Sequence, residues 1–231
     1  MHMLTGVIIA LKGEKRLKQF IQALDFCDEV LVMENKGEVE IDFSALRNKA
    51  LKDAKNEWVL YVDTDETISE PLKSEILSVV KNPLREAYRI KRLDVFWGKP
   101  VMYGEVLKAR KQGLIRLIHK NSGTWKGKVH EEFITSNSVG QLEHPLQHNA
   151  HSSIAGFLAK INFYSSLRAD ELHARNERTN VVAIATIPIV KFLFSFFILG
   201  GFRDRARGFV YSFMMSFHSF LVRSKLFLLQ S

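Results

Sequence analysis

Apolar and polar residues follow two different spacings along the first third of the chain. Short apolar runs rich in β-branched residues alternate with segments whose apolar residues recur every three or four positions. The first spacing predicts buried strands, and the second predicts helices with one buried face. The predicted strands cover residues 6–11, 29–33 and 58–62, and the predicted helices cover residues 14–24, 44–54 and 70–80. Strands that alternate with helices predict an α/β fold with parallel strands and right-handed crossovers.

Two serines stand where the second and third of these helices begin. Ser44 and Ser69 are predicted N-caps, because a serine side chain can accept a hydrogen bond from the backbone N–H groups of the first turn. Pro71 supports the start at Ser69, and Asn82-Pro83 marks the end of that helix.

The pattern changes along the rest of the chain. Further strands at residues 87–93 and 114–118 predict a mixed, mostly parallel sheet flanked by helices. Later residues have helical spacing at 157–174 and are almost wholly apolar at 181–202 and 209–222. We therefore predict a first domain over residues 1–151 and a helical C-terminal extension over residues 152–231.

The charge of the chain narrows the classes of partner. The chain has 231 residues, a formal net charge of +8 and a pI of about 9.5, which suits nucleic acid, an anionic membrane or a phosphorylated substrate. Spacings typical of RRM, KH or zinc-finger modules are absent from the sequence, so nucleic acid is not an expected partner. A single cysteine, Cys27, and an N-terminus without the features of a signal peptide favour the cytoplasm.

The C-terminal apolar runs raise the question of a membrane. Residues 181–202 are long enough to span one, but Pro188 and Lys191 interrupt the run. Basic residues flank the runs, which favours helices lying in the interface of an anionic membrane: Arg203, Arg205, Arg207, Arg223 and Lys225. The alternative is a helical subdomain that packs on the first domain or forms a homo-oligomer interface.

Three carboxylates follow the third predicted strand, in the stretch WVLYVDTDET. Asp63, Asp65 and Glu66 stand where a parallel sheet places its ligand crevice, beyond the carboxyl ends of the strands. Carboxylates this close repel one another unless a cation compensates. Oxygen ligands suit Mg²⁺ or Mn²⁺, and a metal bridged to a diphosphate would supply that charge. The alternative is a solvated turn with acids favoured before a helix.

The cluster stands among motifs that run through nearly the whole chain in order. They are RN-x-A-L at residues 47–51, EWVLYVDTDE at 57–66, IRLIHK at 115–120, GKVHEEF at 127–133, PLQH at 145–148 and GFRDRARGFVYSFMMSFHSFLVRSKL at 201–226. In this order the motifs resemble the family 2 glycosyltransferases of the GT-A fold, and most of all the lipopolysaccharide core biosynthesis subgroup.

The resemblance implies a nucleotide-diphospho-sugar transferase fold and a site for a nucleotide-sugar donor. It implies transfer of the sugar, with inversion, to a cell-envelope glycan or glycolipid acceptor such as lipopolysaccharide core, on the cytoplasmic face of the inner membrane. The implied metal ligands, for Mg²⁺ or Mn²⁺, are Asp63, Asp65 and His148. The implied donor contacts are Glu34, Arg47, Asp63 and Arg116.

The resemblance also implies a catalytic base. Inversion needs a group that takes the proton of the acceptor hydroxyl, and a carboxylate is the natural choice. Glu131 is the first candidate and Glu132 the second, whereas a surface turn is the alternative for both. His148 has a structural hydrogen-bonding role as its alternative.

Two other classes remain open at this point. Asp63-Thr-Asp-Glu-Thr67 also fits the DxDxT pattern of haloacid-dehalogenase-type phosphatases, with Asp63 as nucleophile and Asp65 as acid and base. That class expects the motif on its first strand, however, and here two strand-helix units precede it. The non-enzymatic alternative is a basic peripheral membrane protein, which the C-terminal runs favour and the carboxylate cluster does not.

Overall fold

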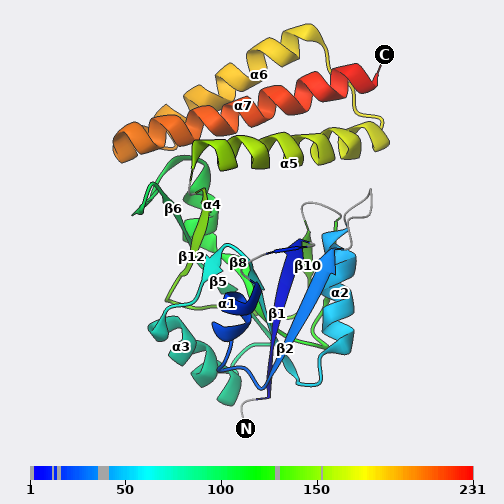
Figure 1. Ribbon diagram of the computed structural model, residues 1–231, viewed down its shortest axis with the longest axis vertical. Helices are drawn as coiled ribbons and strands as arrows, with labels where there is room; N and C mark the ends of the chain where they lie inside the picture. Colours follow the sequence, from blue (N-terminus) through cyan, green and yellow to red (C-terminus); the bar gives the residue numbers. More distant parts are fainter. Residues whose placement is uncertain are drawn as a thin grey trace. The chain divides into compact units, whose positions relative to one another are not determined.

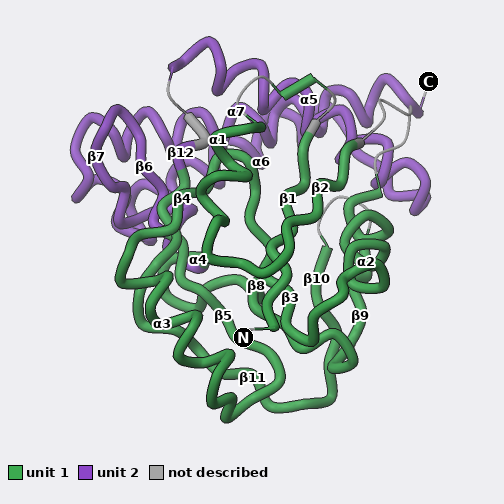
Figure 2. Tube along the Cα trace, turned by 60° about the horizontal axis from the view of Figure 1, so that its bottom comes forward, with its two compact units in different colours: residues 1–92, 109–148 green, residues 93–108, 149–231 purple. Residues whose placement is uncertain are grey.

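The chain divides into two compact units, shown in different colours in Figure 2. The structure is a computed structural model that describes residues 3–11, 13–14, 17–35, 42–127, 131–151 and 153–230. Unit 1 comprises Met1–Arg92 and Ala109–His148, and unit 2 comprises Leu93–Lys108 and Asn149–Ser231. Residues 93–108, which the sequence pattern places in the first domain, therefore belong with the C-terminal helices.

Unit 1 is built on a six-stranded sheet with the order β11-β5-β8-β3-β1-β2. Its strands are β1 (Leu4–Leu11), β2 (Glu29–Asn35), β3 (Trp58–Asp63), β5 (Ala87–Ile90), β8 (Leu114–His119) and β11 (Val139–Gln141). β1 pairs in parallel with β2 and β3, and β11 pairs in parallel with β5, whereas β8 is antiparallel to both of its neighbours. The predicted mixed, mostly parallel sheet is confirmed.

Two hydrophobic cores cover the faces of this sheet. Three helices of unit 1 are α1 (Leu17–Gln22), α2 (Phe43–Asp53) and α3 (Glu70–Lys81), drawn in Figure 1. Because side chains alternate along a strand, Leu60 of β3 packs in the core with Leu72 of α3, and Val59 packs with Ala50 of α2 in the other. A strand buried on both faces explains why residues 58–62 read as one continuous apolar run.

Two local predictions are wrong. Asp42, and not Ser44, is the N-cap of α2: the Asp42 Oδ1 atom accepts the Ala45 N–H at 2.9 Å and the Ser44 hydroxyl at 2.8 Å. A charged acceptor is favoured at the positive end of a helix, and it leaves Ser44 as a donor. The strand predicted at residues 87–93 ends at Ile90, and a second strand, β6 (Arg92–Phe96), follows. The Ser69 N-cap is confirmed, because its hydroxyl accepts the Leu72 N–H.

Short elements complete unit 1. They are β4 (Glu66–Thr67), α4 (Leu107–Gln112), β9 (Thr124–Lys126), β10 (Glu132–Ile134) and β12 (Leu146–His151), of which α4 and β12 also have residues in unit 2. β9 and β10 form an antiparallel pair, and β12 pairs antiparallel with β4 so that His148 lies opposite Glu66. This second pairing brings the motif at residues 145–148 to the carboxylate cluster.

Unit 2 is dominated by three long helices. α5 (Ile154–Ala174) and α6 (Val181–Leu193) both pack on α7 (Arg205–Leu229), as Figure 1 shows. Unit 2 also contains β6 from Leu93 on, β7 (Lys99–Pro100), η1 (Gly104–Val106), η2 (Phe194–Ile198) and η3 (Gly201–Asp204). The predicted helical extension is confirmed, although the apolar run at 181–202 is not one helix: α6 passes into a π-turn at η2 and then into a 3₁₀ turn at η3.

Glycine explains the tight turn after η2. A Cβ atom at Gly208 would lie 1.8 Å from the carbonyl oxygen of Gly201, so only glycine fits where the start of α7 meets this turn. The turn therefore fixes how η2 and the end of α6 meet α7.

Candidate active site

The carboxylate cluster lies where β3 ends. β3 is buried up to Val62, and the chain then turns through Asp63 and Asp65 into β4, which begins at the buried Glu66. β1 and β2 run parallel to β3, so all three strands end at this edge of the sheet. This is the edge at which open α/β sheets bind their ligands.

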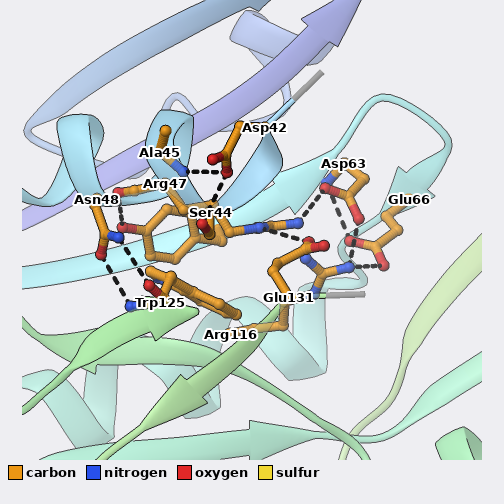
Figure 3. A network of polar contacts seen from close by, with 11 residues as sticks. Asp42, Ser44, Ala45, Arg47, Asn48, Asp63, Glu66, Arg116, Trp125 and Glu131 are labelled. Carbon is orange, nitrogen blue, oxygen red and sulfur yellow. Dashed lines mark hydrogen bonds and ion pairs between the residues drawn. The ribbon is translucent and has the colours of Figure 1, made fainter. Parts of the chain in front are cut away.

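Two buried arginines hold Asp63 (Figure 3). The Arg47 Nη2 atom donates to Asp63 Oδ1 at 3.1 Å, and the Arg116 Nη2 atom donates to Asp63 Oδ2 at 2.5 Å. Arg116 also donates to Glu66 Oε1 at 2.7 Å, and the Asp63 N–H donates to Glu66 Oε2 at 3.0 Å. The positive charge that the cluster requires is thus present in the protein itself, as guanidinium groups.

Arg47 connects this cluster to the first candidate base. Its Nε atom donates to Glu131 Oε1 at 2.9 Å, so one guanidinium joins Asp63 to Glu131. Rings lie against that guanidinium: Arg47 Cζ is 4.9 Å from the ring centroid of Trp125 and 5.3 Å from that of Tyr61. The planar, delocalised charge of arginine suits both the stacking and the two ion pairs.

The residue after Arg47 fixes the neighbouring strand. The Asn48 side chain donates to the Trp125 carbonyl at 2.8 Å and accepts the Trp125 N–H at 2.9 Å. The Tyr61 hydroxyl donates to the Arg47 carbonyl at 2.8 Å. The RN-x-A-L motif therefore places a charge in the site with its first residue and holds β9 with its second.

The acids of the cluster differ in their pKa values. Burial raises the pKa of Asp63, but Arg116 and Arg47 more than offset this and hold that pKa at about 2, so Asp63 is ionised at neutral pH. Burial raises the pKa of Glu66 above its ordinary value, because Arg116 does not offset burial and the repulsion from Asp63 together. Burial lowers the pKa of Arg116, whereas its two carboxylate partners raise it above its ordinary value. The cluster carries fixed charge at Asp63 and Arg116.

Asp65 and His148 form a separate pair beside the arginine network. The His148 Nε2 atom lies 3.4 Å from Asp65 Oδ1, because β12 pairs with β4. An imidazole nitrogen and a carboxylate oxygen are a donor set that fits Mn²⁺ or Mg²⁺ when phosphate oxygens complete the shell. Asp63 differs, since both of its oxygens accept from arginines. In the part of the chain that the structure describes, no three His, Cys, Asp or Glu side chains gather as a metal site.

The other candidate residues differ in how far they are exposed to solvent. Glu34 is exposed at the end of β2. Glu131 is mostly buried and bound to Arg47, whereas Glu132 is exposed on β10 beside the buried Phe133. His130, in the same motif, lies outside the described residues. The structure thus joins Arg47, Asp63, Arg116 and Glu131 in one network, which also contains Glu66, a residue to which sequence reasoning gave no role of its own.

Glu75 holds the segment that leads to His148. Its carboxylate accepts the N–H groups of Glu143 and His144 at 2.7 and 3.0 Å, and the His144 Nδ1 atom lies 2.8 Å from it. Partial burial raises the pKa of Glu75, but these hydrogen bonds together lower it by more, so the net pKa lies below the usual 4.5.

Glu75→Gln is expected to lower the free energy of unfolding by about 1 kcal/mol near pH 7. A depressed pKa contributes stability that is present above the unfolded value of 4.5 and is lost as the pH falls through the folded value. The difference between wild type and variant should therefore shrink toward about pH 3, as measured by urea unfolding at several pH values. Glu70→Gln, an exposed acid on the same helix, is the matched control. A difference that is constant with pH would contradict the assignment.

Comparison with known proteins shows what the chain is similar to. No protein-family model matches the chain. The uncharacterized glycosyltransferase RP128 of Rickettsia prowazekii is 31% identical over 74% of this chain, and the match spans 62% of that protein. The uncharacterized glycosyltransferase RT0209 of Rickettsia typhi is 27% identical over 98% of this chain and 87% of that protein. The predicted resemblance to glycosyltransferases is confirmed.

One relative carries a more particular name. The lipopolysaccharide core biosynthesis glycosyltransferase LpsC of Rhizobium meliloti is 23% identical over 97% of this chain and 92% of that protein. Among solved structures, S. aureus TarS in complex with UDP-GlcNAc matches 94% of this chain and 81% of its own, with a TM-score of 0.44 and 12% identity. A structural likeness at that level says nothing about the chemistry of the site.

Proposed function

We propose that the protein is a GT-A-type glycosyltransferase that moves a sugar from a nucleotide-diphosphate donor to a cell-envelope glycan or glycolipid, such as lipopolysaccharide core. The observation that carries this proposal is the edge of the sheet where Asp65 and His148 stand beside a buried arginine network. The names of the relatives support the class of reaction.

Two arginine nitrogens favour an anionic ligand at this edge. Arg47 Nη1 and Arg116 Nε are buried and have no hydrogen-bond partner among the described residues. A buried donor without an acceptor costs free energy, and diphosphate oxygens would remove that cost. Asp63 then orients the two arginines, and the exposed Glu34 accepts a hydrogen bond from the ribose or the base of the donor.

Asp65 and His148 are the residues that would hold Mg²⁺ or Mn²⁺. When bound, the ion supplies charge that stabilises the departing nucleotide diphosphate. The β4–β12 pairing places His148 opposite Glu66, the residue after Asp65, and so brings the imidazole nitrogen close to the Asp65 carboxylate. Asp63 contributes to the same site through the arginines and not as a direct ligand.

Glu131 is the proposed base. Its Oε1 atom is held by Arg47, and its carboxylate would accept the proton of the acceptor hydroxyl as that oxygen attacks the sugar from the side opposite the nucleotide. Attack from that side inverts the configuration of the sugar carbon. Glu132 is exposed on β10 and lacks this link to the network.

The phosphatase alternative fits the geometry less well. It requires Asp63 as a nucleophile, and both Asp63 oxygens accept from arginines. We also infer a cytoplasmic protein that binds peripherally to the inner membrane, where a glycolipid acceptor would be found.

Binding of nucleotide sugars tests the proposal. A panel of donors is titrated calorimetrically against the full chain with Mn²⁺, with Mg²⁺ and with excess EDTA. We expect one donor class to bind with an affinity that depends on the metal, and to be hydrolysed slowly without acceptor. If no donor binds, or if nucleotide sugars bind equally well in EDTA, the proposed use of the site is wrong.

A further inference from the structure

The outer face of α6 and η2 is apolar and exposed. The exposed positions recur as adjacent pairs: Val181 and Val182, Ala185 and Thr186, Ile189 and Val190, Leu193 and Phe194, Phe197 and Ile198. We call these ten residues the α6 stripe. Val182, Val190 and Ile198 are 69%, 63% and 71% exposed. Thr186 is its one side chain with a polar group, and the Thr186 hydroxyl donates to the Val182 carbonyl at 2.8 Å.

The opposite face of the same segment is fixed to α7. The Ser195 and Ser212 hydroxyls lie 3.0 Å apart, and the Ser216 hydroxyl donates to the Pro188 carbonyl at 2.5 Å. Phe192 meets Phe209 edge to face, with ring centroids 5.5 Å apart. Polar groups therefore face the protein, and the exposed stripe is the stable outer surface of a packed helix.

The charged residues near the α6 stripe indicate which kind of partner it would bind. From residue 178 to the end, the sequence has seven basic residues and one acid: Arg178, Lys191, Arg203, Arg205, Arg207, Arg223 and Lys225, against Asp204. Asp204 is buried, and its carboxylate accepts the N–H groups of Met102 and Tyr103 at 2.8 and 2.9 Å. Exposed arginines stand at both ends of the stripe, Arg178 before it and Arg203 and Arg205 after it.

We propose that the α6 stripe lies in the interface of an anionic lipid bilayer, with α6 parallel to the membrane plane and the flanking arginines at lipid phosphates. Apolar area on one face, with basic residues beside it, is what interfacial helices require. This partner deepens the proposed function, on which it rests for the expectation of a membrane-bound acceptor.

Two other arrangements fit the charges and contacts less well. Pairing of the stripe with a second copy would gather basic residues, since Arg178, Arg203 and Arg205 are exposed at its ends and Glu177 is the one exposed acid among residues 176–207. The segment Val181–Ile198 has the length and the mean hydropathy, 2.3, of a membrane span. However, a spanning α6 would lose the hydrogen bond from the Ser216 hydroxyl of α7 to the Pro188 carbonyl. It would also separate Lys191 from Glu105, which lies 3.8 Å away.

Vesicle flotation of the full chain, without nucleotide, tests the proposal. Wild type is expected to bind phosphatidylglycerol-containing vesicles strongly and phosphatidylcholine vesicles weakly. Phe194→Asp/Phe197→Asp should lower the partition coefficient at least about 100-fold, because two exposed aromatic side chains would no longer enter the bilayer. Leu84→Asp, at an 83% exposed leucine of unit 1, is the matched control and should bind as wild type does.

A second pair of variants tests the charge. Arg178→Gln/Arg205→Gln should lower binding to the anionic vesicles about tenfold and leave binding to phosphatidylcholine unchanged. Ile198→Asp changes another exposed residue of the stripe and should also weaken vesicle binding. Circular dichroism of every variant shows whether a loss of binding is a loss of folding. Unchanged binding of the phenylalanine variant, or wild-type protein that resists alkaline carbonate extraction, would overturn the interfacial arrangement.

Self-association is the remaining outcome against the proposal. A wild-type dimer that the phenylalanine variant converts to a monomer, with no vesicle binding by either, would assign the stripe to a second copy. Donor binding is measured without vesicles, so failure of the membrane proposal and failure of the proposed reaction are distinguishable.

Discussion

Glu131→Gln is expected to lower kcat by about 10²- to 10⁴-fold while leaving the affinity for the nucleotide sugar nearly unchanged. A general base acts as the proton moves, so its loss affects the transition state more than donor binding. Glutamine keeps the shape of the side chain, and its carbonyl oxygen can still accept from Arg47 Nε, the contact that Glu131 makes at 2.9 Å. Steady-state kinetics with an accepted donor, together with calorimetric donor binding, separate the two effects.

Glu132→Gln is the matched control for this experiment. Glu132 is the next residue, is exposed on β10 and is not joined to Arg47, so its replacement should leave kcat almost unchanged. If Glu132→Gln lowers kcat strongly and Glu131→Gln does not, Glu132 is the base and Glu131 is not. Two fully active variants would move the base elsewhere, and Glu105 and Glu143 would be tested next.

The fold was predictable because its strands are covered on both faces. Residues 58–62 are continuously apolar because β3 is buried between two cores, and such a run stands out against the helical spacing around it. The strand break after Ile90 could not be predicted from this signal. β5 and β6 are separated by one residue, Lys91, and the alternation changes phase there, from Tyr88 and Ile90 to Leu93 and Val95, a change that the predicted strand overlooked.

The partners of the site arginines could not be predicted. Arg116 meets Asp63 because β8 runs antiparallel to β3, with Leu60 opposite Leu117. No local sequence pattern predicts the register of two strands whose paired residues are more than fifty positions apart in sequence. Sequence reasoning therefore named both arginines as donor contacts and missed that each is ion-paired with acids of the same site.

The C-terminal segment shows the opposite case. The sequence shows that residues 181–202 are apolar, and the structure shows which face of them is exposed. The run at 181–202 is apolar on every side of a helical projection, so it does not tell which face is covered. The contacts of Ser195 and Ser216 with α6 and α7 settle the inner face, and the stripe of exposed pairs follows from them.

Asp65→Asn is expected to reduce sugar transfer at least about 100-fold and to remove the dependence of donor binding on Mn²⁺ or Mg²⁺. An amide is a much weaker ligand for a hard cation than a carboxylate is, and the His148 imidazole, 3.4 Å from Asp65 Oδ1, would be left as the main protein ligand. The measurements are the transfer rate and, independently of activity, Mn²⁺ binding followed by electron paramagnetic resonance with the nucleotide diphosphate present.

The matched control for Asp65→Asn is Asp53→Asn, which makes the same chemical change at an exposed acid of α2 that pairs with Lys49. It should retain both transfer and Mn²⁺ binding. His148→Gln should weaken Mn²⁺ binding less than Asp65→Asn does, because the charged ligand contributes more to the affinity for a divalent cation than a neutral imidazole. Full wild-type activity in excess EDTA, or an Asp65 variant whose donor binding still responds to Mn²⁺, would show that the ion is not held here, and Asp65 and His148 would then be a structural pair that joins β12 to β4.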